Sequence, residues 1–193
     1  MNDIVNSQLP ELLLELESKC KEIGFTMPSD RKIGSLLRTL ITSKPNANLL
    51  ELGTGIGLSL CWMVEGMDSG SRLTTIDNDA ELIDIAKNYF GADQRLNLLC
   101  TDGSEWLKHY KGEKFDLIFA DAWPGKYSET EIALDLLKAG GFYVIDDMTL
   151  QPNWPEGHQD NVNALLEFLE TRKDLVLTRL HWSSGVIIAT KRE

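Results

Sequence analysis

The stretch "LLELGTGIGLS", residues 49–59, runs from an apolar segment through a glycine-rich turn into the start of a helical pattern. Gly53, Gly55 and Gly57 permit positive φ angles and let backbone N–H groups approach an anionic ligand closely. Asp77 ends the next apolar segment, 24 positions after Gly53, where its carboxylate can accept hydrogen bonds from ribose hydroxyls. These two features predict a nucleoside-cofactor site at the end of a strand.

Outside this turn, short apolar segments alternate with amphipathic ones along the whole chain. The pattern predicts strands at 47–52, 72–77, 96–101, 115–120, 142–146, 175–180 and 185–190. It predicts helices at 10–25, 33–43, 57–66, 80–90, 104–110, 128–141 and 162–172. The helix at 128–141 opens with a capping-box pattern, Ser128 with Glu131.

Apolar strands that alternate with helices are typical of a mainly parallel sheet covered on both faces. The connection between the last two strands is too short for a crossover helix, so these strands should form an antiparallel hairpin. We therefore predict one α/β domain over 1–193, with a Rossmann-like, doubly wound, seven-stranded sheet. Its N-terminal helices occupy 1–45 and its core 46–193.

Carboxylates recur at one end of the predicted strands. In a parallel sheet the carboxyl ends of the strands share an edge, and ligands bind there at the topological switch point. We therefore expect one ligand site formed by the polar residues that follow successive strands, namely Glu51, Asp77, Thr101, Asp102, Asp121, Asp146 and Asp147.

Composition restricts the partners. A formal charge of −11 and the lack of a lysine/arginine run argue against nucleic acid. No apolar run approaches the roughly 18 residues of a membrane span, and the first residues lack the pattern of a signal peptide. Cys20, Cys61 and Cys100 have no C-x-x-C spacing and are interpreted as small buried hydrophobic residues. A cytoplasmic location is the expectation.

The spacing of the glycines distinguishes two kinds of cofactor. A dinucleotide site favours G-x-G-x-x-G, which needs a glycine where this chain has Leu58. Glu51 followed by G-x-G-x-G resembles motif I of the class I S-adenosylmethionine-dependent methyltransferases, and the terminal hairpin is also a mark of that family. The resemblance implies S-adenosylmethionine as cofactor, bound by Glu51, Gly53, Gly55, Gly57, Ser59, Asp77, Asp102, Gly103, Ser104 and Asp121.

The second half of the chain is similar to the catechol and caffeoyl-coenzyme A O-methyltransferase group. The similarity is carried by "FDLIFADAWPGKY" and "FYVIDDM", with Trp123 and Tyr127 at matching positions. It implies methyl transfer to a small, aromatic, hydroxyl-bearing acceptor. It also implies a divalent cation, Mg²⁺, Ca²⁺ or Mn²⁺, held by Asp121, Asp146 and Asp147, the last standing where asparagine is usual. Such enzymes are often dimers, so a homodimer is an expectation.

Without reference to any family, three converging carboxylates repel one another. Either a cation is bound or at least one carboxylate is protonated. The alternative is that Asp146 or Asp147 turns away and caps the next segment.

The general base is the main departure from that group, because Pro124 occupies the position of its lysine. Lys126 reaches the site if the Pro-Gly turn folds back; otherwise it is a solvated surface lysine. A second alternative is another base, such as a free aspartate, Tyr127 or His158, or the metal acting alone. A third is a protein that binds cofactor without efficient turnover. Asp121 and Lys126 are the catalytic candidates, and metal-independent methylation is the rival reaction.

The segment 148–160 contains two prolines and a glycine and lies beside the predicted site. Such irregular segments often shape a substrate pocket. Met148 and Trp154, together with Trp123, are therefore candidate lining residues for the acceptor. The alternative is that the tryptophans only pack this loop onto the body of the protein.

Overall fold

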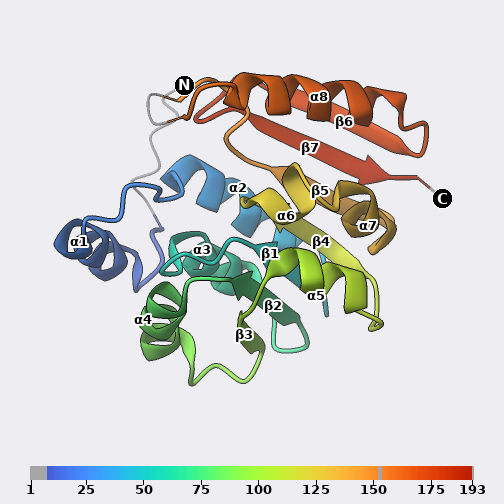
Figure 1. Ribbon diagram of the computed structural model, residues 1–193. Helices are drawn as coiled ribbons and strands as arrows, with labels where there is room; N and C mark the ends of the chain where they lie inside the picture. Colours follow the sequence, from blue (N-terminus) through green and yellow to red (C-terminus); the bar gives the residue numbers. More distant parts are fainter. Residues whose placement is uncertain (1–7, 152–153, 193) are drawn as a thin grey trace.

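The computed structural model describes residues 8–151 and 154–192. A seven-stranded sheet with the order β3-β2-β1-β4-β5-β7-β6 crosses the molecule (Figure 1). Its strands are β1 (Asn48–Leu52), β2 (Arg72–Asp77), β3 (Leu96–Cys100), β4 (Phe115–Ala120), β5 (Leu137–Ile145), β6 (Leu175–Leu180) and β7 (Val186–Lys191). The predicted Rossmann-like sheet is confirmed.

Strands β1 to β5 pair in parallel, whereas β7 is antiparallel to both β5 and β6. The predicted C-terminal hairpin is thus confirmed, and it extends the sheet beyond β5. The strand order reverses between β1 and β4, which are neighbours. Their carboxyl ends are tied together, because the Asp121 N–H donates to the Leu52 carbonyl over 2.9 Å. This is the switch point at which a ligand site is expected.

The helices cover both faces of the sheet. They are α1 (Leu13–Ile23), α2 (Arg31–Thr42), α3 (Leu58–Gly66), α4 (Ala80–Phe90), α5 (Gly103–His109), α6 (Trp123–Lys126), α7 (Thr130–Asp135) and α8 (His158–Thr171). Buried residues of α1, α2 and α3 pack on one face, and those of α5, α7 and α8 on the other. Leu49 and Leu50, adjacent on β1, contribute to opposite cores, as the two-residue period of a strand requires. Among the described helices, none combines the length and apolar character of a bilayer span.

The predicted helix 128–141 is wrong in extent. Helix α7 covers only Thr130–Asp135, and β5 already begins at Leu137, which pairs with Phe115. The capping box is wrong as well: the cap position is Glu129, with a positive φ of 50° and no side-chain cap. The Ser128 hydroxyl lies instead 3.3 Å from that of Ser104. Pairing with β4 therefore overrides the local helical signal of this segment.

The cysteines follow the prediction in two positions of three. Cys20 and Cys61 are buried, but Cys100 is exposed. Strand β3 is the edge of the sheet and its side chains are only partly covered, so an apolar pattern there does not bring burial.

Candidate functional site

The glycine-rich turn after β1 is held against the end of β2. Gly53, Gly55 and Gly57 have φ angles of 104°, 51° and 99°, a region that favours glycine. The Gly53 N–H donates to the Ile76 carbonyl at 2.9 Å, and the Gly55 N–H donates to Asp77 Oδ2 at 2.8 Å. A Cβ added to Gly57 would lie 2.5 Å from the Phe90 ring, so the turn also needs glycine for close packing.

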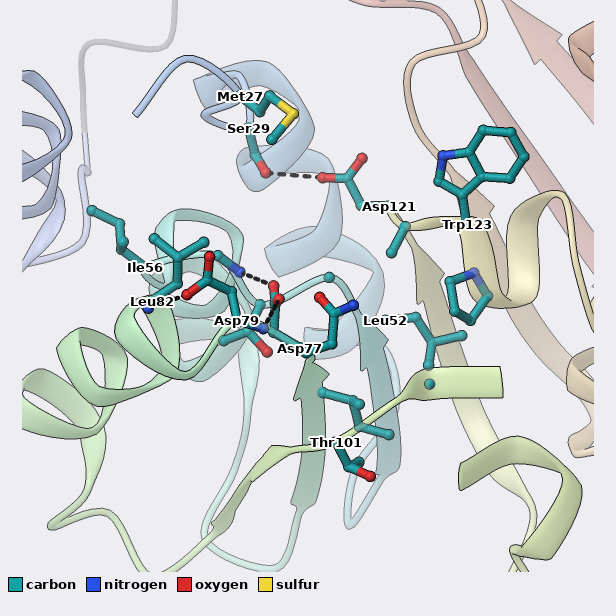
Figure 2. Close-up of a pocket in the computed structure, with 18 of the residues that line it drawn as sticks. Met27, Ser29, Leu52, Ile56, Asp77, Asp79, Leu82, Thr101, Asp121 and Trp123 are labelled. Atoms are coloured by element: carbon teal, nitrogen blue, oxygen red, sulfur yellow. Dashed lines mark hydrogen bonds between the residues drawn. The ribbon is translucent and has the colours of Figure 1, made fainter. Parts of the chain in front are cut away.

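Asp77 and this turn line a cavity of about 400 Å³. The other carboxylate oxygen of Asp77, Oδ1, accepts the Asp79 N–H at 3.0 Å. Figure 2 shows Asp77 and Asp79 at one part of the cavity wall, and Ser29 joined to Asp121 by a hydrogen bond at another. Three other predicted cofactor residues, which follow other strands, also line the cavity: Asp102, Gly103 and Asp121. The structure thus brings the predicted glycine turn and the predicted ribose acid to one cavity wall.

Glu51 and Ser59 lie beneath the turn, and neither lines the cavity. The Glu51 carboxylate is fully buried and accepts the Ser59 hydroxyl at 2.6 Å and the Thr75 hydroxyl at 2.5 Å. Burial raises the pKa of Glu51 to about 7; the two hydroxyl donors oppose this shift and Asp77 adds to it. In this structure Glu51 and Ser59 therefore stabilise the turn through buried hydrogen bonds and do not contact the cavity.

The raised pKa of Glu51 makes stability depend on pH. Between pH 4.5 and about 7, the unfolded chain ionises Glu51 while the folded protein keeps it protonated. The free energy of unfolding should therefore fall with rising pH across this window, by on the order of 3 kcal/mol. Glu51→Gln removes the titrating group and should flatten this fall in urea unfolding. Glu65→Gln, at an exposed position of α3, should keep it; equal slopes in both variants would contradict the assignment.

The predicted cofactor residues that follow β3 divide into two that face the cavity and one that does not. Asp102 and Gly103 line it, and the Asp102 side chain caps α5 by accepting the Glu105 N–H at 2.9 Å. The Ser104 hydroxyl instead donates to Glu129, outside the cavity. A Cβ on Gly103 would lie 3.0 Å from Pro124, so glycine lets α5 approach the next turn.

A second cavity, of about 670 Å³, adjoins the first. The two share Met27, Ser29, Asp121, Ala122 and Trp123 in their walls. Asp146 and Asp147, at the end of β5, line only the second cavity, so the structure places all three predicted metal-binding aspartates along it. Asp121 stands where the two cavities meet.

Lys126 corrects one interpretation of the sequence. It is not a solvated surface lysine: only 5% of the residue is exposed, and it lines the second cavity. The Pro-Gly turn does fold back, because the Tyr127 and Ser128 N–H groups both donate to the Trp123 carbonyl, at 2.8 and 3.0 Å. Gly125, with φ 80°, allows this reversal.

The three aspartates line one cavity but do not form a preformed metal site. Within residues 8–151 and 154–192, no three histidine, cysteine or carboxylate groups are disposed to hold a metal. Burial raises the pKa of Asp121 well above its ordinary value; the Asp146 carboxylate raises it further, and the Lys126 ammonium lowers it. Burial also raises the pKa of Asp146, against the hydrogen bond from Ser184. The Lys126 side chain therefore already places a positive charge near these carboxylates.

An aromatic cluster forms another wall of the second cavity. His158 is surrounded by three rings, with ring centroids 4.4 Å away for Trp154, 5.1 Å for Tyr127 and 6.0 Å for Trp123. The Tyr127 hydroxyl lies 3.1 Å from His158 Nε2. All four residues line the cavity. Met148, by contrast, packs against the hydrophobic core and lines neither cavity, so its predicted place in the pocket is wrong.

Three serines of the site escaped sequence reasoning. The Ser29 hydroxyl donates to Asp121 at 3.3 Å and the Ser184 hydroxyl donates to Asp146, while Ser183 lines the same cavity. Ser29 precedes α2 and the other two precede β7, far from the aspartates in sequence. No sequence spacing links these serines to the aspartates, so only the tertiary structure could show that they lie together.

Comparison with known proteins agrees with this geometry. A sequence profile of the O-methyltransferase family matches residues 4–179, which is more than half of the chain. The chain belongs to the O-methyltransferase family. A proposed O-methyltransferase of Mycobacterium avium is 32% identical over an alignment of 118 positions, gaps included, that covers 58% of this chain and 53% of that protein. The chain spans about half the length of the curated relatives it matches.

Solved structures share the fold of this family member. An O-methyltransferase from Bacillus cereus in complex with S-adenosylhomocysteine has a TM-score of 0.83 at 23% identity, covering 97% of this chain and 94% of that one. One from Streptomyces achromogenes, involved in tomaymycin synthesis and solved with S-adenosylmethionine, has a TM-score of 0.84 at 22% identity, covering 98% and 93%. The likeness extends over nearly the whole length of each chain.

Proposed function

We propose that this protein transfers a methyl group from S-adenosylmethionine to a hydroxyl oxygen of a small aromatic acceptor. The observation that carries the proposal is the pair of adjoining cavities with Asp121 and Trp123 in their common wall. A two-substrate transfer needs its donor and acceptor side by side, because holding both in place removes much of the entropic cost of the reaction. Family membership supports the same reaction class.

The first cavity suits S-adenosylmethionine by its chemistry. Its volume of about 400 Å³ lies in the range of small-ligand sites. Asp77 would accept the ribose hydroxyls, the turn at Gly53 and Gly55 would contact the methionine end, and Asp102 and Gly103 would adjoin the adenine. The bound cofactor supplies a sulfonium methyl group open to attack by an oxygen. Relatives of the same fold hold this cofactor or its demethylated product.

The second cavity suits an aromatic acceptor with polar substituents. Trp123, Tyr127 and Trp154 provide flat apolar surface, while the aspartates and Lys126 provide hydrogen-bonding groups. Tyr127 is not the base in this proposal, since burial raises its pKa and keeps the phenol protonated. A divalent cation is not part of the proposal either, because the described residues contain no preformed group of metal ligands.

The test is incubation with S-adenosylmethionine and a panel of catechols, simple phenols and aliphatic alcohols. Formation of S-adenosylhomocysteine together with a methyl ether of a catechol or phenol supports the proposal. Cofactor binding by calorimetry without turnover on any acceptor would instead support the alternative of a cofactor-binding protein. Exclusive methylation of aliphatic alcohols would contradict the aromatic acceptor.

Trp154 should matter for the acceptor and not for the cofactor. Trp154→Ala removes a ring from the second cavity only, so we expect the acceptor KM to rise by about tenfold, the cost of one lost aromatic contact. The dissociation constant of S-adenosylmethionine should stay the same. Leu150→Ala is the matched control, since Leu150 lies on the same segment, is 73% exposed and lines neither cavity. A Trp154→Ala enzyme with unchanged acceptor KM would show that this ring only packs the loop.

A further inference from the structure

Lys126 is a buried lysine, and within residues 8–151 and 154–192 no carboxylate forms an ion pair with it. We propose that the Lys126 ammonium is the internal cation of the second cavity and takes the place of a divalent metal ion. The protein then has no need of added metal. The catalytic part of this inference rests on the proposed function, whereas the part about charge and metal binding does not.

The turn that precedes Lys126 is fixed by hydrogen bonds and by close packing at Gly125. The Gly125 N–H donates to the Ser128 carbonyl at 2.7 Å, and the buried Tyr143 hydroxyl donates to the Gly125 carbonyl at 2.5 Å. A Cβ on Gly125 would lie 2.4 Å from Leu52 Cδ1, so this turn needs glycine at its centre. The turn is thus built into the core, and the position of Lys126 follows from it.

The ammonium itself is available to a ligand. Lys126 Nζ lies 5.2 Å from the centroid of the Tyr127 ring, and no carboxylate of the described residues forms an ion pair with it. It still acts electrostatically on Asp121 and Asp146, whose charged forms it favours. Among the described residues, Lys126 Nζ does not belong to the fully buried polar atoms that lack a partner, so it faces the open cavity, where an occupant can supply a hydrogen-bond acceptor.

The aspartates, in turn, are engaged in ways that leave less room for a metal. Asp146 Oδ1 accepts both the Ser184 hydroxyl and the Asp147 N–H, the latter at 2.7 Å. Asp121 Oδ2 accepts the Ser29 hydroxyl. Asp147 has a φ of 53°, in the left-handed region that aspartate and asparagine adopt more readily than most residues. Two hydroxyl donors and one ammonium thus compensate the carboxylates without any ion from solution.

The chemistry balances without any proton transfer to or from Lys126. The acceptor oxygen forms a bond to the methyl carbon as the carbon–sulfur bond breaks, and the electron pair of that bond stays on sulfur, giving a thioether. The hydroxyl proton leaves to a carboxylate of the cavity and then to solvent. Lys126 donates a hydrogen bond to the acceptor oxygen and stabilises its developing negative charge, as a metal ion would.

Metal titration tests the inference without any knowledge of the acceptor. Wild-type protein titrated with Mn²⁺ at neutral pH, followed by calorimetry and by the electron paramagnetic resonance of the free ion, should show no saturable site. Lys126→Met removes the internal cation and leaves the carboxylates uncompensated, so Mn²⁺ affinity should rise by at least about tenfold over wild type. Lys126→Gln serves the same purpose if the methionine variant does not fold.

Two control variants assign the effect to this charge. Lys126→Arg keeps a cation and should bind Mn²⁺ no better than wild type. Lys108→Met makes the same charge change outside the cavity, at a lysine that pairs with Glu105, so it should gain no site. A folded Lys126→Met or Lys126→Gln protein without gained affinity overturns the proposal. So does a wild-type Mn²⁺ site that Asp146→Asn abolishes.

Activity gives a second, separate outcome. With an acceptor in hand, wild-type turnover should change less than about twofold when a chelator is added, and a loss of about tenfold or more that Mg²⁺ restores would overturn the inference. If no acceptor is methylated at all, the proposed function fails, but the metal titrations still decide whether Lys126 is the internal cation.

Discussion

Lys126→Met is expected to slow methyl transfer by about a hundredfold to a thousandfold, the usual effect of removing a group that stabilises a developing oxyanion. Methionine has a similar length and suits the buried position, so the fold should persist. The first cavity does not include Lys126, and the dissociation constant of S-adenosylmethionine should therefore be unchanged. Stopped-time assays of S-adenosylhomocysteine at saturating cofactor measure the effect.

Two further variants make this result specific. Lys126→Arg retains the charge and should recover part of the rate. Lys108→Met removes a lysine that is 44% exposed on α5, pairs with Glu105 and lines neither cavity, so its turnover should match wild type. Equal turnover in Lys126→Met and wild type would show that the buried ammonium takes no part in the reaction.

Asp77→Ala is expected to weaken S-adenosylmethionine binding by about tenfold to a hundredfold, the cost of losing hydrogen bonds to a charged acceptor. The carboxylate would bind the ribose and also holds the Gly55 N–H, so its loss removes a ligand contact and loosens the turn. Asp77→Asn keeps the size and one acceptor oxygen, and should lose less affinity. Isothermal titration calorimetry with S-adenosylhomocysteine measures both.

The control for Asp77 is Asp84→Ala, which removes an exposed carboxylate from the next helix, α4. Its cofactor affinity should equal that of wild type. Unchanged affinity in Asp77→Ala would refute the assignment of the first cavity to the cofactor, because no other carboxylate in the described residues links the glycine turn to β2.

Local patterns predicted most of the fold because each pattern reflects the packing of its own segment. Strands buried on both faces read as apolar runs, so β1 and β4 were predicted within a residue or two of their ends. The errors arose where pairing with a distant strand decided the outcome. Leu137 joins β5 by pairing with Phe115, although its own neighbourhood has a helical pattern. Cys100 is exposed because β3 has a neighbour on one side only.

The site divides in the same way. The carboxylates that end the strands were predictable, since all parallel strands deliver their carboxyl ends to one edge of the sheet. The partners of these carboxylates were not, because Ser29 and Ser184 come from segments that share no pattern with β4 or β5. Glu51 and Ser59 matched a motif correctly in sequence, yet their side chains face one another beneath the turn.

By itself, the sequence determined the alternation of strands and helices, the glycine turn, and the acidic residues at the strand ends. These are local properties of backbone conformation and of hydrophobic spacing. Only the tertiary structure decided that Lys126 is buried among Asp121, Asp146 and Asp147. The physical reason is that its direction depends on the contacts of Gly125 with Leu52 and Tyr143, which belong to other strands and meet the turn only in the folded protein.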